Sequence, residues 1–155
     1  IVNDALPDGI KIVRCKYIDR KSKSLMSVIS NAAYVVKCEF EKDYTNDELI
    51  NALDKLLSRD EIIMKKKNKK GKVKDINIKE LIDTANILSI FDGEMILKTT
   101  VKTGSAGNLR PEEILKQLNQ LEGIEIKLDS IRVHRLEAYT KDGDKMSSLY
   151  DYYKN

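Results

Sequence analysis

The chain has 155 residues, of which 41% are hydrophobic and 34% are charged. This composition excludes a disordered tail and a collagen-like fibre, and the length predicts a single globular domain over residues 1–155. The net charge is only +3, from 28 Lys and Arg against 25 Asp and Glu, so the average charge does not point to an acidic partner.

The first part of the chain switches between strand and helix patterns. Apolar and polar residues alternate over residues 10–19 after a Pro-Asp-Gly turn, which predicts a strand. Ser24 is a suitable N-cap for a short helix with apolar residues at helical spacing up to Ala32. Residues 34–40 alternate again, which predicts a strand with one buried face and places Cys38 in the core.

A second helix is predicted where Thr45 and Glu48 match a capping box ahead of the leucine stripe in residues 49–57. Two short strands, around residues 61–67 and 72–78, follow this helix. They are separated by a lysine-rich segment with a glycine, so we expect a hairpin with lysines at its tip.

A helical turn at residues 79–83 leads into a second predicted hairpin over residues 86–91 and 94–102. This hairpin is expected to turn on Asp92 and Gly93, because an Asp-Gly pair suits a two-residue turn.

The last third of the chain predicts one more long helix and one more strand. The helix begins at Pro111 and ends at Gly123, and the strand covers about residues 130–140. An amphipathic C-terminal helix is expected from the spacing of Met146, Leu149, Tyr150 and Tyr153. The whole order of elements predicts an α+β fold with a largely antiparallel sheet, helices packed on one face, and ferredoxin-like units.

The cysteines and the N-terminal residues indicate a cellular compartment. Cys15 and Cys38 are too few and too widely spaced for a zinc site or an iron–sulfur cluster built by this chain alone. No signal-peptide pattern opens the sequence, and no apolar run is long enough to span a bilayer. We therefore expect a cytoplasmic protein with reduced thiols, no bound metal and no membrane contact.

Three segments carry a resemblance to a known family. They are Leu6-Pro7-Asp8-Gly9-Ile10-Lys11, the run from Ser24-Leu25-Met26-Ser27 to Asn31-Ala32-Ala33-Tyr34, and Gly104-Ser105-Ala106-Gly107-Asn108-Leu109-Arg110-Pro111-Glu112-Glu113. Together they resemble the radical-SAM-linked domain of unknown function. Lys74-Asp75-Ile76-Asn77-Ile78 is similar to a Val-Asp-Ile-Arg-Pro-like segment of that family, with Asn77 and Ile78 in place of the Arg and Pro.

The resemblance implies a partner. Members of that family are fused to, or encoded beside, radical-SAM proteins with a cobalamin-binding-like region. An iron–sulfur cluster and S-adenosylmethionine would then belong to the partner, and this chain would hold no cofactor. The family also has an N-terminal portion that this chain lacks, so the resemblance implies that the chain is the C-terminal part of a longer protein.

Seven lysines fall within the first predicted hairpin, and no acid interrupts them. They are Lys65, Lys66, Lys67, Lys69, Lys70, Lys72 and Lys74. The remaining 21 cations face 25 anions, so the rest of the chain carries a charge of −4. Such a cluster can bind the phosphates of RNA by releasing condensed counterions, although it also fits a solvated hairpin tip. No aromatic residue interleaves with these lysines, so only backbone binding is predicted.

The loop over residues 104–111 is a second candidate for anion binding. It leads into a helix N-terminus, where free N–H groups and the helix dipole attract anions, and Asn108 and Arg110 lie beside it. Glu112 and Glu113 would repel an anion there, and the glycines also suit a tight turn. Arg110 could offset these acids and grip a phosphate or carboxylate.

His134, Arg135, Leu136 and Glu137 resemble a His-Arg-Leu-Asp motif of some pseudouridine synthases. Strict alternation along a strand would place Glu137 on the opposite face from His134, which makes a structural histidine the simpler interpretation. No catalytic residue is assigned.

Three functions stay open from the sequence. The first is a non-catalytic accessory domain that presents RNA or a ribonucleoprotein to a radical-SAM partner. The second is an RNA-modifying enzyme distantly like a pseudouridine synthase, with Glu137 or Asp75 as its acid–base group. The third is a protein-docking module that uses Arg110 and the C-terminal tyrosines.

Overall fold

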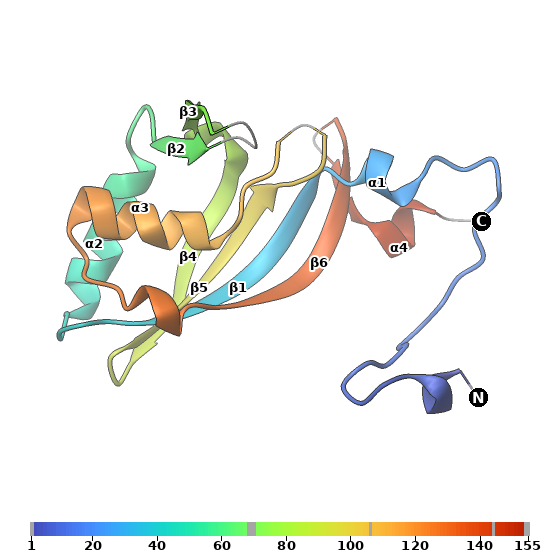
Figure 1. Ribbon diagram of the computed structural model, residues 1–155, viewed down its shortest axis with the longest axis horizontal. Helices are drawn as coiled ribbons and strands as arrows, with labels where there is room; N and C mark the ends of the chain where they lie inside the picture. The colour runs from blue at the N-terminus through green and yellow to red at the C-terminus, as the bar shows by residue number, and fades with distance from the viewer. Residues whose placement is uncertain (1, 68–70, 106, 144, 154–155) are drawn as a thin grey trace.

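Five antiparallel strands form a curled sheet in the order β4-β5-β1-β6-β7 (Figure 1). The computed structural model describes residues 2–67, 71–105, 107–143 and 145–153. The strands of the sheet are β1 (Asn31–Glu39), β4 (Ile82–Phe91), β5 (Glu94–Lys102), β6 (Arg132–Asp142) and β7 (Lys145–Ser148). A separate hairpin is made of β2 (Ile63–Lys67) and β3 (Val73–Asn77).

Two long helices, α2 (Asn46–Leu57) and α3 (Glu112–Glu122), cover one face of the sheet (Figure 1). Two short helices, α1 (Leu25–Val28) and α4 (Leu149–Tyr152), lie at the β6–β7 end. The remaining helical turns are η1 (Asn3–Ala5), η2 (Lys79–Leu81) and η3 (Leu128–Ser130).

The connection order identifies a ferredoxin-like unit. Elements β1, α2, β4, β5, α3 and β6 follow one another as β-α-β-β-α-β, and their strands lie in the order β4-β5-β1-β6. The β2–β3 hairpin is inserted between α2 and β4, and β7 is added at the β6 edge. The predicted α+β class, the antiparallel sheet and the helices on one face are confirmed.

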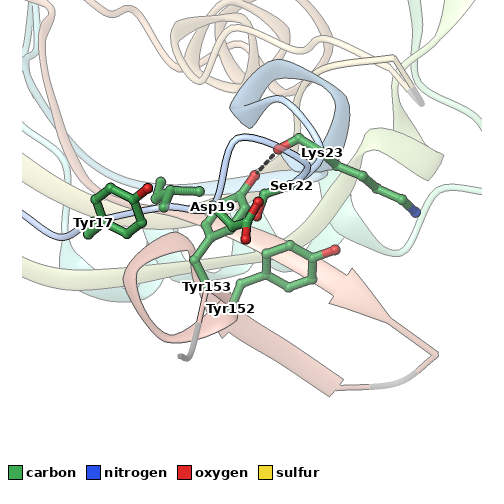
Figure 2. A pocket seen from close by; sticks show the side chains of 7 residues that line it. Tyr17, Asp19, Ser22, Lys23, Tyr152 and Tyr153 are labelled. Atoms are coloured by element: carbon green, nitrogen blue, oxygen red, sulfur yellow. Dashed lines mark hydrogen bonds between the residues drawn. The ribbon is translucent and has the colours of Figure 1, made fainter.

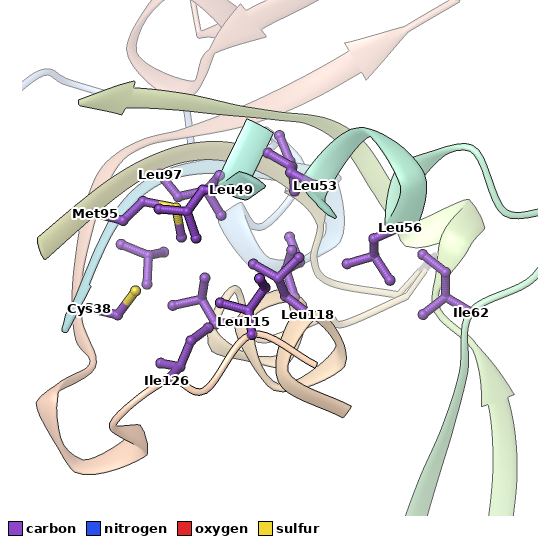
Figure 3. Close-up of a cluster of buried hydrophobic side chains, with 14 of the residues drawn as sticks. Cys38, Leu49, Leu53, Leu56, Ile62, Met95, Leu97, Leu115, Leu118 and Ile126 are labelled. Carbon is purple, nitrogen blue, oxygen red and sulfur yellow. The ribbon is translucent and has the colours of Figure 1, made fainter. Parts of the chain in front are cut away.

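The core lies between the two long helices and the sheet (Figure 3). Leu49 and Leu56 of α2 and Leu115 and Leu118 of α3 are fully buried. They meet fully buried side chains of β1 and β5, which are Val36, Cys38, Met95, Leu97 and Val101. Burial raises the pKa of the Cys38 thiol to about 12, so this cysteine is an inert core residue, as the alternation predicted.

Local signals set several boundaries as the sequence predicts. Thr45 and Glu48 form a complete capping box at the start of α2. Gly123 ends α3 with φ of 71°, a left-handed conformation that glycine adopts without strain. Asp92 and Gly93 turn the β4–β5 hairpin with φ of 51° and 72°.

The predicted strand over residues 10–19 is wrong. These residues form no strand, and together with the rest of residues 2–24 they make an N-terminal arm that extends from the body (Figure 1). The alternating residues find no partner strand in the described part of the chain, and alternation alone cannot supply ladder hydrogen bonds. Instead, Asn3 holds the arm to itself by hydrogen bonds with the backbone of Ile12.

Two predicted helices are also corrected. The helix expected up to Ala32 ends at Val28, because Ile29 is extended and Ala32 already pairs with Val101 in the sheet. The C-terminal helix begins only at Leu149, since Met146 belongs to β7 and pairs with Lys141.

A buried carboxylate joins the two long helices. The Glu122 side chain is only 2% exposed, and its oxygens lie 2.9 Å from Lys55 Nζ and 2.7 Å from Arg59 Nη2. Burial alone raises the pKa of Glu122, but the hydrogen bonds from Lys55 and Arg59 outweigh it and hold the pKa below its ordinary value. The pairing therefore supports packing of α3 on α2.

We expect Glu122→Gln to lower the free energy of unfolding by about 1–3 kcal/mol at pH 7, because it removes charge-assisted bonds from a buried site. A carboxyl group with a lowered pKa stabilises the folded state fully above its unfolded pKa of about 4.3, and this contribution disappears as the pH falls through the folded pKa. The difference in free energy of unfolding between wild type and variant should therefore shrink on acidification, as measured by urea unfolding at pH 7 and pH 3. A difference that stays constant with pH would contradict the ion pairing.

Candidate nucleic-acid interface

The base of the β2–β3 hairpin is anchored to the core. Ile62 is fully buried, and Ile78 N–H donates to Ile62 O at 2.8 Å. The side-chain oxygen of Asn77 accepts from the N–H groups of both Ile62 and Lys79 at 3.1 Å. Asn77 therefore closes the base of the hairpin. This structural role could not be predicted from the family segment, which has an arginine at the position of Asn77.

The outer part of the hairpin is charged and exposed. Lys66 lies directly opposite Lys74, and Lys65 lies opposite Asp75. The described lysines of the cluster are all exposed; they are Lys65, Lys66, Lys67, Lys72 and Lys74. Lys69 and Lys70 fall outside the described residues. Like charges directly across a ladder destabilise it, so the Lys66 and Lys74 pair costs stability in the absence of an anion.

A cleft of about 300 Å³ separates β2 from α3, lined by Met64 and Lys65 on one side and Glu113, Lys116 and Gln117 on the other. Lys116 Nζ pairs with Glu113 Oε1 at 2.8 Å, which neutralises that acid. The cleft places the basic hairpin beside the first turns of α3.

Arg110 lies just before the first turn of α3. Its carbonyl oxygen accepts a hydrogen bond from the Glu113 N–H at 3.0 Å. The Arg110 side chain is exposed, as is Asn108. Glu112 and Glu113 occupy the first turn of α3 as expected, and only Glu113 has an ion-pair partner among the described residues. Arg110 is thus an exposed cation just before α3, although it does not line the hairpin cleft.

The glycines of the loop before α3 are explained by packing. Gly104 has φ of 88°, and a Cβ there would collide with the carbonyl oxygen of Ile29. Gly107 lies against the side chain of Leu81, where a Cβ would also collide. The Thr103 N–H donates to Ser30 O at 2.8 Å, so this loop is fastened to the start of β1. Both glycines have a structural role, and an anion-binding role of Asn108 and Arg110 stays a prediction.

The family model described as "Uncharacterized protein conserved in bacteria (DUF2344)" matches residues 1–111 of this chain. The chain belongs to this family. The matched part of the DUF2344 chain contains the arm, the lysine hairpin and the loop before α3, whereas α3, β6, β7 and α4 follow it. The expectation of a domain of unknown function is thus confirmed, whereas its link to radical-SAM proteins stays a prediction.

One solved structure is similar in fold to the DUF2344 chain. A chain of the "Crystal Structure of a Cbf5-Nop10-Gar1 Complex" superposes with a TM-score of 0.53 at 14% identity. The match covers 80% of this chain and 35% of the other, so the DUF2344 chain spans about a third of that chain's length. At this identity the likeness shows the fold alone. Among curated proteins, none matches this chain in sequence.

The motif in β6 of the DUF2344 chain differs from its predicted geometry. His134 pairs with Val35 and Glu137 with Ala33, and these partners point to one face of β1. A β-bulge at Arg135 and Leu136, opposite Tyr34, inserts the extra residue. His134 and Glu137 therefore share a face, and the expectation of opposite faces is wrong. Glu137 Oε1 accepts from the Ala138 N–H at 3.0 Å, and Asp75, the other acid considered, lies exposed on the hairpin.

The C-terminal tyrosines hold the arm of the DUF2344 chain. The Arg14 guanidinium lies 4.0 Å from the centroid of the Tyr150 ring, and Lys16 Nζ donates to Tyr150 O at 3.0 Å. The Tyr153 hydroxyl donates to Lys23 O at 2.6 Å, beside an open cavity of about 680 Å³ between the arm and α4 (Figure 2). Arg14 thus lies at the α4 end, away from the lysine hairpin (Figure 1).

Within the described parts of the chain, no group of three or more His, Cys, Asp or Glu side chains could hold a metal ion. Cys15 is exposed in the arm and Cys38 is buried in the core, and both are free thiols. No described helix is long and apolar enough to cross a membrane.

We expect Gly104→Ala to lower the free energy of unfolding by about 1–3 kcal/mol, because alanine resists a positive φ and its methyl group meets the Ile29 carbonyl. Arg110→Ala, in the same loop, should leave the urea midpoint nearly unchanged, since its side chain is exposed. Urea unfolding of both variants tests the difference. An equal loss of stability in the two variants would contradict a structural role for Gly104 that Arg110 does not share.

Proposed function

We propose that this DUF2344 domain binds the sugar–phosphate backbone of RNA through its lysine hairpin. In this proposal it is a non-catalytic accessory domain that presents RNA or a ribonucleoprotein to a radical-SAM partner. The partner holds the iron–sulfur cluster and S-adenosylmethionine, and this chain supplies the contact with the substrate.

The placement of Lys66 opposite Lys74 carries the RNA part of the proposal. Two ammonium groups on neighbouring strands repel each other, and Asp75 opposite Lys65 offsets only one of the clustered cations. A phosphate backbone laid along the hairpin would relieve this repulsion and gain free energy from released counterions. The hairpin is an insertion in the ferredoxin-like unit, so its cost in stability is not required by the fold.

The composition of the hairpin supports backbone contacts rather than base contacts. Residues 62–78 contain no Phe, Tyr or Trp, so no ring is available for base stacking. Lysine acts as a flexible point charge and suits phosphates without reading sequence. In this proposal Arg110, exposed just before α3, supplies one further phosphate contact.

A charge-removal experiment tests RNA binding. Lys65, Lys66, Lys67 and Lys74 are replaced together by Gln, and binding of a labelled single-stranded RNA of mixed sequence is followed by fluorescence anisotropy. Each lost phosphate contact should reduce the slope of log K against log salt by about 0.7, so the four changes should reduce it by up to about 3.

The matched control replaces Lys21, Lys23, Lys141 and Lys145 by Gln. These exposed lysines lie in the arm and at the β6–β7 hairpin, and their loss changes the net charge equally. The control should keep the wild-type affinity and slope at each salt concentration. Equal effects of the two quadruple changes would show that net charge alone drives binding and would contradict a site at the hairpin.

The partner is tested by co-purification of the full-length protein with a separately expressed candidate radical-SAM protein, with and without nuclease. The proposal expects the partner in both samples and RNA only in the sample without nuclease. Recovery of the partner with no RNA in either sample would remove RNA from the proposal. Loss of the partner in both samples would contradict the accessory role.

A further inference from the structure

The open cavity between the N-terminal arm and α4 plays no part in the proposed RNA contact. Its volume of about 680 Å³ is within the usual range of small-molecule pockets. Residues of the arm between Tyr17 and Lys23 line one side, and Tyr152 and Tyr153 line the other (Figure 2). None of the lining residues belongs to the lysine hairpin or to the core between the long helices and the sheet.

The arm is fastened to α4 at both ends of this wall. At one end, the Tyr153 hydroxyl donates to Lys23 O at 2.6 Å, and Tyr153 is only 9% exposed. At the other end, Lys16 Nζ donates to Tyr150 O at 3.0 Å, and the Arg14 guanidinium lies over the Tyr150 ring. These contacts form the cavity without any ligand, so binding requires little ordering of the arm.

Two exposed tyrosine rings give the cavity its apolar surface. Tyr17 is 75% exposed and Tyr152 is 39% exposed, and Figure 2 shows them on either side of Asp19. The Tyr152 ring meets the Tyr153 ring edge to face, with centroids 4.9 Å apart and an interplanar angle of 86°. A ring held in this way suits stacking with a planar aromatic group such as a nucleobase.

A turn at residues 19–22 fixes a hydrogen-bond acceptor in the same cavity. The Ser22 N–H donates to Asp19 O at 3.0 Å, and the Lys21 N–H donates to Asp19 Oδ1 at 2.8 Å. Within the described residues, no other donor bonds to this carboxylate. A carboxylate accepts from donors on the edge of a base, and guanine presents two adjacent donors, N1–H and N2–H. Asp19 therefore favours guanine over a base with acceptors at that edge.

The charge of the lining fits a single phosphate group. Asp19 and Lys23 are its charged residues. Lysine meets a phosphate as a point charge on a flexible stem, and one lysine matches one phosphate group rather than a run of them. Arg20 and Lys21 are exposed in the same turn, which disfavours a cationic ligand that rings and a carboxylate could otherwise hold.

We propose that the cavity between the arm and α4 binds a free nucleoside monophosphate with a guanine base. The base stacks on the tyrosine rings, Asp19 accepts from its N1–H and N2–H groups, and Lys23 binds the phosphate. This site is separate from the RNA contact at the lysine hairpin and goes beyond it, because the cavity has one cation where the hairpin has a cluster.

Ring stacking is tested by calorimetry with guanosine monophosphate and the full chain. The wild type should bind one nucleotide saturably, and Tyr17→Ala and Tyr152→Ala should each weaken binding by at least about fivefold. Tyr152→Phe keeps the ring and should bind as the wild type does. Phe91→Ala is the matched control, because Phe91 is a ring at the end of β4 that is 79% exposed and lies outside the cavity.

The two charged residues are tested with paired ligands. Wild type should bind guanosine monophosphate at least about fivefold more tightly than adenosine monophosphate, and Asp19→Asn should remove this preference. An asparagine oxygen still accepts from the Lys21 N–H, so the turn is kept. Guanosine without its phosphate should bind more weakly to the wild type, and Lys23→Gln should remove that difference. Circular dichroism checks that each variant is folded.

Four results would overturn the proposal. They are no saturable binding of guanosine monophosphate, tyrosine variants that bind it as Phe91→Ala does, equal affinity for the guanine and adenine nucleotides, and tighter binding of trimethyllysine than of the nucleotide. A single-stranded RNA that displaces the nucleotide, with an affinity that Tyr152→Ala lowers, would assign the cavity to an RNA strand instead. The quadruple Gln variant of the hairpin lysines should bind the nucleotide as the wild type does, so the two sites can fail independently.

Discussion

The one-sided packing of α2 and α3 against β5 and β1 is the constraint on which the rest of the molecule depends. Fully buried leucines of both helices meet Val36, Leu97 and Val101, and this is where the apolar core lies. Burying these side chains is the main favourable contribution to folding. Because both helices cover the same face and favour the β4-β5-β1 side, β6 and the arm are left with little apolar cover (Figure 1). The parts of the domain that the two helices do not cover are therefore the ones that stay exposed.

Patterns within a few residues were sufficient to predict much of this fold. The capping box of Thr45 and Glu48, the Asp92 and Gly93 turn and the Gly123 cap each act on adjacent backbone groups, so their geometry can be read without tertiary contacts. The arm shows the limit of that approach. Residues 10–19 have the alternation of a strand, but a strand exists only when a neighbour supplies hydrogen bonds.

Features of the candidate sites that depend on pairing between strands were less accessible from the sequence. The bulge in β6 depends on its register against β1, and it reverses the expected relation between His134 and Glu137. The double hydrogen bond to Asn77 requires that β2 and β3 be brought together. The lysine cluster and Arg110 could be found from composition, whereas the cross-strand placement of Lys66 and Lys74 needed the register.

The separation of the lysine hairpin from the β6 edge has a thermodynamic consequence. In the sheet order, β5 and β1 lie between β6 and β4, the strand that follows the hairpin in the chain, and no described element belongs to both the hairpin and β6. Two ligands bound at such distant sites change each other's affinity only if the protein has two global states that they favour unequally. The structure describes one arrangement of the core. A ligand bound at the lysine hairpin is then expected to leave the β6 side of the sheet unchanged.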